Sequence, residues 1–168
     1  MCSLNGTLIS SFPQPFSMSS LTVVGLFSLA QGRQIKSEGT RSTTYTHYSS
    51  AWRCSNLTDA PVDIRIFSPG ADSIMSDFTT ILLIGNVFIP SGPGTILIDA
   101  THTFPFPGDP NYADAYDRHI PECLYPFVFV TGHVHSLSSD GDLYETCRWI
   151  TIATSSYIRG SAKPSIIK

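Results

Sequence analysis

Charged residues are scarce in this chain: Asp, Glu, Lys and Arg make up 14% of its 168 residues, against about a quarter in an average globular domain. The formal net charge is −3, which argues against the broad positive field of a tight, nonspecific nucleic-acid binder but is compatible with a local basic patch. Helical periodicity is almost absent as well. Because Gly and Pro each occur 12 times, the composition favours a β-rich fold with many turns.

The chain also lacks the signals of export and of membrane insertion. Residues 1–19 have no basic start, and Pro13 and Pro15 interrupt their apolar runs, so they do not resemble a secretory signal. Their composition predicts a disordered arm instead. No apolar run approaches the roughly 20 residues of a membrane span. We therefore expect an intracellular protein, nuclear or cytoplasmic, with no membrane contact.

The four cysteines are widely separated and form no CxxC pair, which predicts free thiols in a reducing compartment. They are Cys2, Cys54, Cys123 and Cys147. The chain also lacks the Walker A motif, the GxGxxG fingerprint and the GxSxG nucleophile elbow. We therefore expect a nonenzymatic protein without a cofactor.

The clearest β pattern is the stretch 79–104, TTILLIGNVFIPSGPGTILIDATHTF, in which two apolar runs flank a turn rich in Pro and Gly. The first run has apolar residues on both faces of the predicted strand, which indicates that both faces are covered. The second run alternates, so we expect one face to be shared by Ile96, Ile98, Ala100, His102 and Phe104. The stretch predicts a β-hairpin that closes a small barrel.

Three further strands are predicted before this hairpin. They lie at 21–29, 43–54 and 62–67, with a polar loop at 30–42 and one helical turn capped by Asp72. The order strand, strand, strand, short helical segment, strand, strand is that of the OB-fold, a five-stranded Greek-key barrel. The expected fold class is therefore all-β, with an OB-like barrel over residues 20–104.

The pattern starts again after an acidic, proline-rich connector at 105–125. LTVVGLFSL in the first predicted strand matches VFVTGHVHSL, which starts at Val128, with Gly25 aligned to Gly132. We therefore predict a partial second OB-like copy at 126–168, which ends as its third strand begins. Such a copy has open sheet edges, so it either belongs to a longer protein or pairs with the first copy or with other protein chains.

The segments GHVHSLSSDGDLYETCRWITIATSSYIRG and VFIPSGPGTILIDATHTFPFPG resemble stretches of uncharacterised tandem OB-like proteins of mushroom-forming fungi. The resemblance covers mainly the second half of the chain and contains no catalytic signature. It implies an intracellular protein that binds single-stranded nucleic acid. It supplies no functional residue.

Gly132-His133-Val134-His135 resembles the GHxH metal-ligand motif of calcineurin-like metallophosphoesterases, and two histidines spaced in this way can bind divalent metals. That family also requires an upstream Asp-x-His site and an Asn-His pair, whereas Asn86 is followed by Val87. We therefore expect His133 and His135 to be polar residues on a strand face, and keep a metallophosphoesterase-like enzyme as an alternative.

Basic and aromatic residues gather on one predicted face of the second and third strands and in the loop before them. OB-folds hold single strands on this face, by stacking bases on aromatic rings and contacting phosphates with cations. The tip of the closing hairpin, residues 90–94, carries neither charge nor aromatic ring. The predicted nucleic-acid-binding residues are Arg33, Lys36, Arg41, Tyr45, His47, Arg53, Arg65 and Phe67.

Two functions follow from these patterns. The first is binding of single-stranded nucleic acid through this face. The second is a protein-interaction or assembly module without nucleic-acid binding, which the acidic connector and the incomplete second copy favour. Surface aromatics also form ordinary cross-strand pairs, and cations exceed acids by only 5 − 3 = 2 over residues 31–65.

Overall fold

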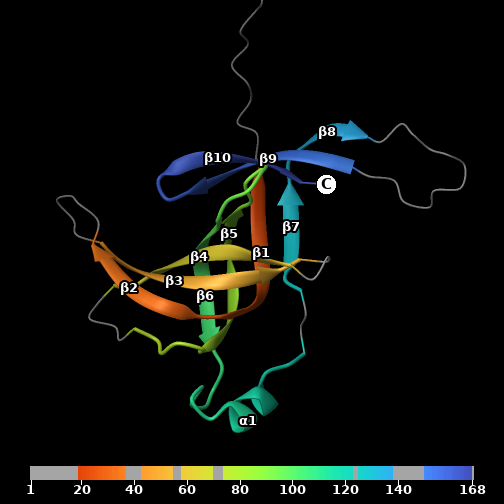
Figure 1. Cartoon of the computed structure of the whole chain (residues 1–168). Coiled ribbons are helices and arrows are strands. Elements are labelled where there is room, and N and C mark those ends of the chain that lie inside the picture. Colours follow the sequence, from red (N-terminus) through yellow and green to blue (C-terminus); the bar gives the residue numbers. More distant parts are fainter. Residues whose placement is uncertain are drawn as a thin grey trace, which may run out of the picture.

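The computed structural model describes residues 19–36, 43–54, 58–69, 74–122, 125–137 and 150–167. These residues are predominantly β-structure (Figure 1), which confirms the predicted all-β class. No helix in these parts of the chain has the length and apolarity needed to span a membrane.

The strands form two sheets. The larger sheet contains β1 (Ser20–Ser28), β2 (Ala30–Lys36), β3 (Thr44–Arg53), β4 (Asp59–Phe67), β5 (Thr80–Phe88), β6 (Ile96–Pro105) and β7 (Phe127–Thr131). The smaller sheet contains β8 (His133–Leu137), β9 (Ile150–Ile158) and β10 (Ser161–Ile167). The segment between β6 and β7 holds α1 (Ala113–Tyr116) and a 3-10 turn, η1 (Asp117–His119).

The larger sheet has the strand order β2-β3-β4-β6-β5-β1-β7. Its β4–β6 pair is parallel, and its other neighbours are antiparallel. Only Leu29 separates β1 from β2, so these strands are the two halves of one bent segment. β2 pairs with β3, at one end of the strand order, and β1 pairs with β5, near the other end. The bend at Leu29 therefore connects the two ends of the series β2-β3-β4-β6-β5-β1.

Alternating residues of these strands meet in one apolar core. Leu21, Val23 and Phe27 of β1 are buried there together with Leu83 and Val87 of β5. Alternation in the sequence predicts that Tyr48, Trp52 and Cys54 face inward in the strand expected at 43–54 and that Val62, Ile64 and Ile66 face inward on β4. The structure confirms these faces, because Tyr48, Val62 and Ile64 are buried in the core and the other three are half-buried. Asp63 and Arg65 alternate with these residues, so β4 presents polar side chains on its outer face.

The predicted hairpin is confirmed, because β5 and β6 pair in antiparallel fashion. The predicted face of its second arm is wrong beyond Ala100. Ile84 lies opposite His102 and Gly85 lies opposite Ala100, so one extra residue interrupts the alternation as a β-bulge. His102 and Phe104 are consequently exposed, and their rings stack with centroids 6.5 Å apart.

The polar loop predicted at 30–42 is wrong over residues 30–36, which form β2. Ile35 lies opposite Tyr45 and Lys36 lies opposite Thr44. β2 continues β1 past the bend and is largely exposed, so it needs no apolar alternation to pair with β3. The predicted cap Asp72 lies outside the described residues, and the described residues after it form a turn at Asp77 and Phe78.

The connector between β6 and β7 is anchored by Tyr116, which the connector prediction at 105–125 did not foresee. Tyr116 is buried, and its hydroxyl accepts a hydrogen bond of 2.8 Å from the backbone N–H of Thr80. Gly108, with φ of 116°, brings the backbone against the Tyr116 ring, because a Cβ there would lie 3.0 Å from Cδ2. α1 therefore packs at the end of the larger sheet where β5 begins (Figure 1).

The smaller sheet lies across the opposite end of the larger one (Figure 1). Ser156 of β9 accepts a hydrogen bond through Oγ from the N–H of Leu21 at 3.1 Å, and Ser165 of β10 accepts one from Ile89 at 3.2 Å. β7 itself pairs with β1, with Ser20 opposite Thr131. β7 belongs to the predicted second copy, so the two predicted copies share the larger sheet. The domain boundaries remain a prediction.

Candidate nucleic-acid interface

An aromatic row crosses the outer face of β2, β3 and β4. The strand register aligns Ile35, Tyr45 and Phe67 side by side. The Tyr45 and Phe67 rings have centroids 5.9 Å apart, and the Arg65 guanidinium lies 4.4 Å from the Tyr45 centroid. Phe67 is 54% exposed. The row therefore offers an accessible aromatic ring that its neighbours hold in place.

A polar row lies beside the aromatic one. It contains Arg33 of β2, His47 of β3, Arg65 of β4 and Asp99 of β6, aligned by the same register. Arg65 donates through Nε to one carboxylate oxygen of Asp99 at 2.9 Å and through Nη2 to the other. This two-pronged contact fixes the guanidinium that covers Tyr45.

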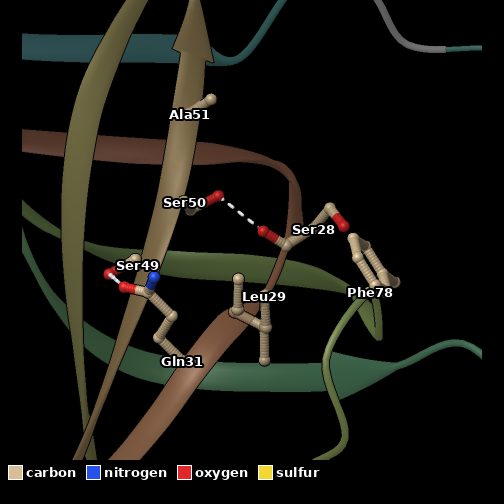
Figure 2. A pocket seen from close by; sticks show the side chains of 8 residues that line it. Ser28, Leu29, Gln31, Ser49, Ser50, Ala51 and Phe78 are labelled. Carbon is tan, nitrogen blue, oxygen red and sulfur yellow. Dashed lines mark hydrogen bonds between the residues drawn. The ribbon is translucent and has the colours of Figure 1, made fainter.

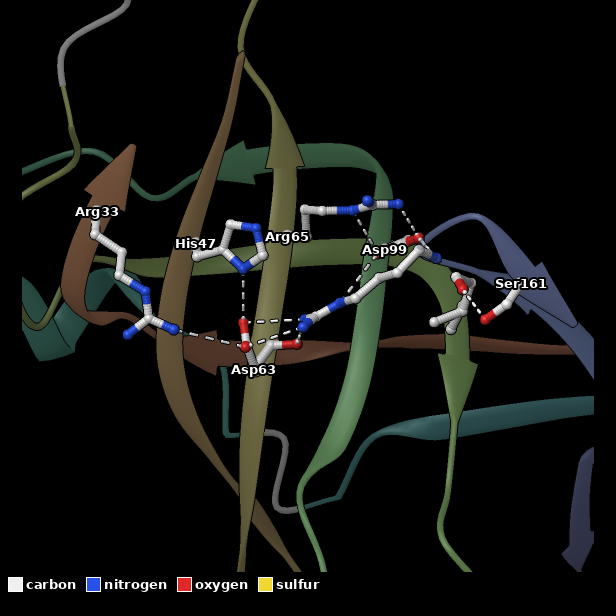
Figure 3. A network of polar contacts seen from close by, with 8 residues as sticks. Arg33, His47, Asp63, Arg65, Asp99 and Ser161 are labelled. Carbon is white, nitrogen blue, oxygen red and sulfur yellow. Dashed lines mark hydrogen bonds and ion pairs between the residues drawn. The ribbon is translucent and has the colours of Figure 1, made fainter. Parts of the chain in front are cut away.

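Asp63 gathers three cationic or titratable side chains, as Figure 3 shows for Arg33 and His47. The His47 Nδ1 lies 3.2 Å from Oδ1 of Asp63, and Arg33 Nη2 lies 3.8 Å from Oδ2. Arg159, in the turn between β9 and β10, donates to Oδ2 of Asp63 at 3.1 Å. Its backbone N–H also donates to Asp99 at 3.0 Å. Arg159 thus ties the smaller sheet to the outer face of the larger one.

The network shifts the pKa values of two of its members. Burial lowers the pKa of His47 below its usual value, although the contact with Asp63 opposes this shift. Burial alone would raise the pKa of Asp63, but the hydrogen bonds and charges of Arg159 and His47 bring it below its usual value. Near neutral pH we therefore expect a neutral imidazole beside an ionised carboxylate.

The structure brings five of the eight predicted binding residues onto one face. The outer face of β2, β3 and β4 carries Arg33, Tyr45, His47, Arg65 and Phe67. Lys36 is also on β2, but it lies opposite Thr44 and therefore points to the other side of the sheet. Arg53 lies at the other end of β3, about 26 Å from Tyr45 at the usual rise per residue, and pairs with Asp59 at 3.4 Å. Arg41 lies outside the described residues.

Sequence reasoning missed Asp63, Asp99 and Arg159 as members of the site. Arg159 and Gly160, with φ of 52° and 80°, form the two-residue turn of the β9–β10 hairpin. An X-Gly pair between two β runs is a hairpin signal that would have found the turn. No sequence pattern links this turn to Asp63, which lies 96 positions earlier.

A separate hollow lies at the bend between β1 and β2, beside β3 (Figure 2). Its volume is about 300 Å³, and it is lined by residues 28–31, residues 49–51 and Phe78. Ser49 donates through Oγ to the side-chain oxygen of Gln31 at 3.1 Å. Ser50 donates to the backbone oxygen of Ser28 at 2.8 Å. No sequence pattern pointed to this hollow.

The histidine pair proposed as a metal motif is only partly described. His133 is exposed in β8, and the side chain of His135 lies outside the description. Within the described part of the chain, no group of three or more His, Cys, Asp or Glu side chains is placed to hold a metal ion. Cys54, also described, is a free thiol.

The chain was compared with protein families, curated proteins and solved structures. No family model matches the chain, and no curated protein matches it. Among solved structures, the fold is similar to a deletion mutant of the single-stranded DNA binding protein from Thermus aquaticus, with 9% sequence identity and a TM-score of 0.43. The similarity covers 88% of this chain and 74% of that chain. A likeness at this level carries no argument about function, and the resemblance to fungal tandem proteins stays a prediction.

Proposed function

We propose that residues 20–104 form an OB-like five-stranded Greek-key barrel. The strand order supports this, since the bent β1–β2 segment pairs with β3 through one half and with β5 through the other. The parallel β4–β6 pair between two antiparallel pairs also supports it. β1 and β2 then count as one barrel strand.

We also propose that the second half of the chain repeats this plan in part. β7 and β8 are separated only by Gly132, as β1 and β2 are separated only by Leu29. β8, β9 and β10 then form an antiparallel meander, as β2, β3 and β4 do. A Cβ at Gly132 would lie 2.3 Å from the backbone oxygen of Ala153, so the bend there requires glycine.

On this barrel, we propose a nonenzymatic binding function for single-stranded nucleic acid at the outer face of β2, β3 and β4. The observation that carries the proposal is the packed set of Tyr45, Arg65 and Phe67, in which an exposed ring is held by a neighbouring ring and a guanidinium. Such rings stack on bases of any sequence. Arg33, which the register aligns with His47 on this face, is placed to contact a phosphate.

The charge balance of the face sets how binding should depend on salt. Its cations are Arg33, Arg65 and Arg159, and its carboxylates are Asp63 and Asp99, so the excess is 3 − 2 = 1 when His47 is neutral. About one phosphate is then neutralised, and the slope of log K against log salt should be about −0.7 for a single strand. Stacking, which salt affects little, should supply most of the affinity.

Fluorescence anisotropy of labelled oligo-dT at several salt concentrations tests this function. We expect Phe67→Ala to weaken binding by about 1 to 3 kcal/mol, because it removes one stacking ring. Phe104→Ala is the matched control, since Phe104 is a similarly exposed aromatic on β6, outside the three strands of this face. Absence of binding at low salt, or equal effects of the two substitutions, would sink the proposal.

A protein-interaction module is the second candidate, favoured by the open edge of β7. Phe127 and Phe129 are exposed on this strand, and residues 127–131 carry no charge to discourage pairing with another strand. The edge strand β2, in contrast, carries Arg33 and Lys36. Sedimentation velocity of the chain and of Phe129→Lys would decide, because only a strand-paired assembly should dissociate on this substitution.

A further inference from the structure

The hollow at the bend between β1 and β2 plays no part in the function proposed above. Its volume of about 300 Å³ lies at the lower end of the range for small-ligand sites. The bend supplies one wall and residues 49–51 of β3 supply another, while Phe78 stands at the side (Figure 2). No charged side chain lines it, so it suits a flat, neutral group.

Phe78 is held beside the hollow in a strained conformation. Its φ is 68°, a region that bulky side chains rarely adopt. Its N–H donates to the backbone oxygen of Leu29 at 2.7 Å, and the N–H of Leu29 donates to Thr79 at 2.9 Å. The N–H of Gln31 donates to Asp77 Oδ1 at 2.8 Å. These bonds fix the turn to the bend, yet the Phe78 ring is 67% exposed.

A strained backbone that presents a large apolar ring to solvent calls for a reason other than packing. A ring fixed in advance loses little freedom when a flat ligand stacks on it. The polar groups beside it match such a ligand. The amide of Gln31 and the hydroxyls of Ser28 and Ser49 line the hollow, and together they offer both donors and acceptors to a ligand edge.

The hollow lies further along β3 than the aromatic and polar rows. Ser49 follows Tyr45 and His47 at alternate positions of β3, so the three share one face, and about 13 Å separates Ser49 from Tyr45. On β2, Gln31 precedes Arg33 by two residues, and its bond to Ser49 shows that it lies on the same side. A single strand that crosses the rows therefore leads into the hollow.

We propose that this hollow is a nucleobase site, in which one base stacks on Phe78 and bonds through its edge to Gln31, Ser28 or Ser49. It binds the end of the single strand whose other bases stack at Tyr45 and Phe67. In this respect it rests on the proposed function. A free nucleoside, which carries a base but no phosphate, is a ligand for the hollow alone.

Two measurements on the full chain test the base site. The first is fluorescence anisotropy of a labelled twelve-nucleotide oligo-dT, which measures its affinity for four proteins. These are the native chain, Phe78→Gly, Phe78→Tyr and the control Phe104→Ala. Gly adopts a φ of 68° without strain, so Phe78→Gly deletes the ring while it preserves the turn, which a circular dichroism melt verifies. The second is NMR titration with adenosine, followed at the backbone amides of Gln31, Ser49 and Phe78.

We expect Phe78→Gly to weaken oligonucleotide binding about fivefold or more with an unchanged salt slope, and Phe78→Tyr and Phe104→Ala to bind within about twofold of the native chain. Adenosine should shift the three amides in the native chain but not in Phe78→Gly. If oligo-dT binding depends on Phe67 but not on Phe78 and adenosine shifts nothing, the base site is overturned and the proposed function stands. If adenosine binds at Phe78 but no oligonucleotide binds, the base site stands and the proposed function fails. If Phe78→Gly unfolds, the adenosine titration of the native chain alone decides.

Discussion

At the scale of single residues, Arg159 connects the smaller sheet to Asp63 and Asp99 of the larger one. Its guanidinium bonds to the carboxylate and to the backbone oxygen of Asp63, and its Nε is buried. We expect Arg159→Gln to lower the free energy of unfolding by about 1 to 3 kcal/mol, because Asp63 then loses charged hydrogen bonds. Urea denaturation measures the change.

The control for this substitution is Arg53→Gln. Arg53 also pairs with an aspartate, Asp59, but both side chains are about half exposed, and such pairs contribute little. We expect the free energy of unfolding to change by less than about 0.5 kcal/mol. Equal losses for the two substitutions would show that Arg159 acts as an ordinary surface residue.

The pKa values of the network set how stability depends on pH. The pKa of His47 is lowered in the folded chain, so its contribution is complete above pH 6.5 and is lost as pH falls through the lower folded value. The pKa of Asp63 is lowered from 3.8, so its contribution is complete above pH 3.8 and is lost on further acidification. Both therefore make the melting temperature rise with pH.

Melting curves between pH 3 and pH 8 check this dependence. We expect His47→Gln to flatten the rise around pH 6, because the titrating group is removed while the ring position stays polar. Asp63→Asn should flatten the acid end and lower stability throughout, since Arg159 then loses its charged partner. A melting temperature that falls as pH rises from 4 to 7 contradicts the pKa directions.

At the scale of elements, the bulge between β5 and β6 depends on Gly85. A Cβ at this position would lie 2.6 Å from the backbone oxygen of Asp99, so backbone must move to admit it. We expect Gly85→Ala to destabilise the chain by about 1 to 3 kcal/mol, as overpacking in a sheet does. Thermal or urea unfolding measures the loss.

Gly92→Ala is the matched control in the same hairpin. A Cβ at Gly92 meets nothing within 4 Å, and alanine restricts the unfolded chain more than glycine does. The free energy of unfolding should therefore stay the same or rise by up to about 1 kcal/mol. A larger loss at Gly92 than at Gly85 would mean that the hairpin tip, not the bulge, limits stability.

Alternation of apolar residues was enough to predict the hairpin and the inward faces of β3 and β4. It could not predict β2, whose polar residues form a strand only because β3 offers a partner edge. It could not predict the exposure of Phe104 either, since one bulged residue reverses the faces. Asp63 alternates with the inward residues of β4, but its partner Arg159 is brought to it by tertiary packing alone.

At the scale of the whole molecule, the smaller sheet shares the core of the larger one. β9 contacts both β1 and β5, Ile158 is fully buried, and Ile167 packs against the main core. We therefore expect the two sheets to unfold in a single cooperative transition, although the sequence predicts separate units at 20–104 and 126–168.

Unfolding of a Trp149→Phe variant, in which Trp52 is the one remaining tryptophan, checks this expectation when it is followed by far-UV circular dichroism and by tryptophan fluorescence. Trp52 packs at the core of the larger sheet, whereas circular dichroism reports on both sheets. The two midpoints should coincide. A separate early transition in circular dichroism would restore the two-unit organisation that the sequence predicts.

The bend at Leu29 also bears on how the chain folds. Its backbone bonds to Phe78 and Thr79, so the bend can form only after the chain closes a loop of 78 − 29 = 49 positions. Contacts of such long sequence separation make folding slow, on the order of milliseconds to seconds for all-β domains. The hollow beside Phe78 should thus be among the last features to appear during refolding, and the nucleoside binding that we propose there would report when the native state is complete.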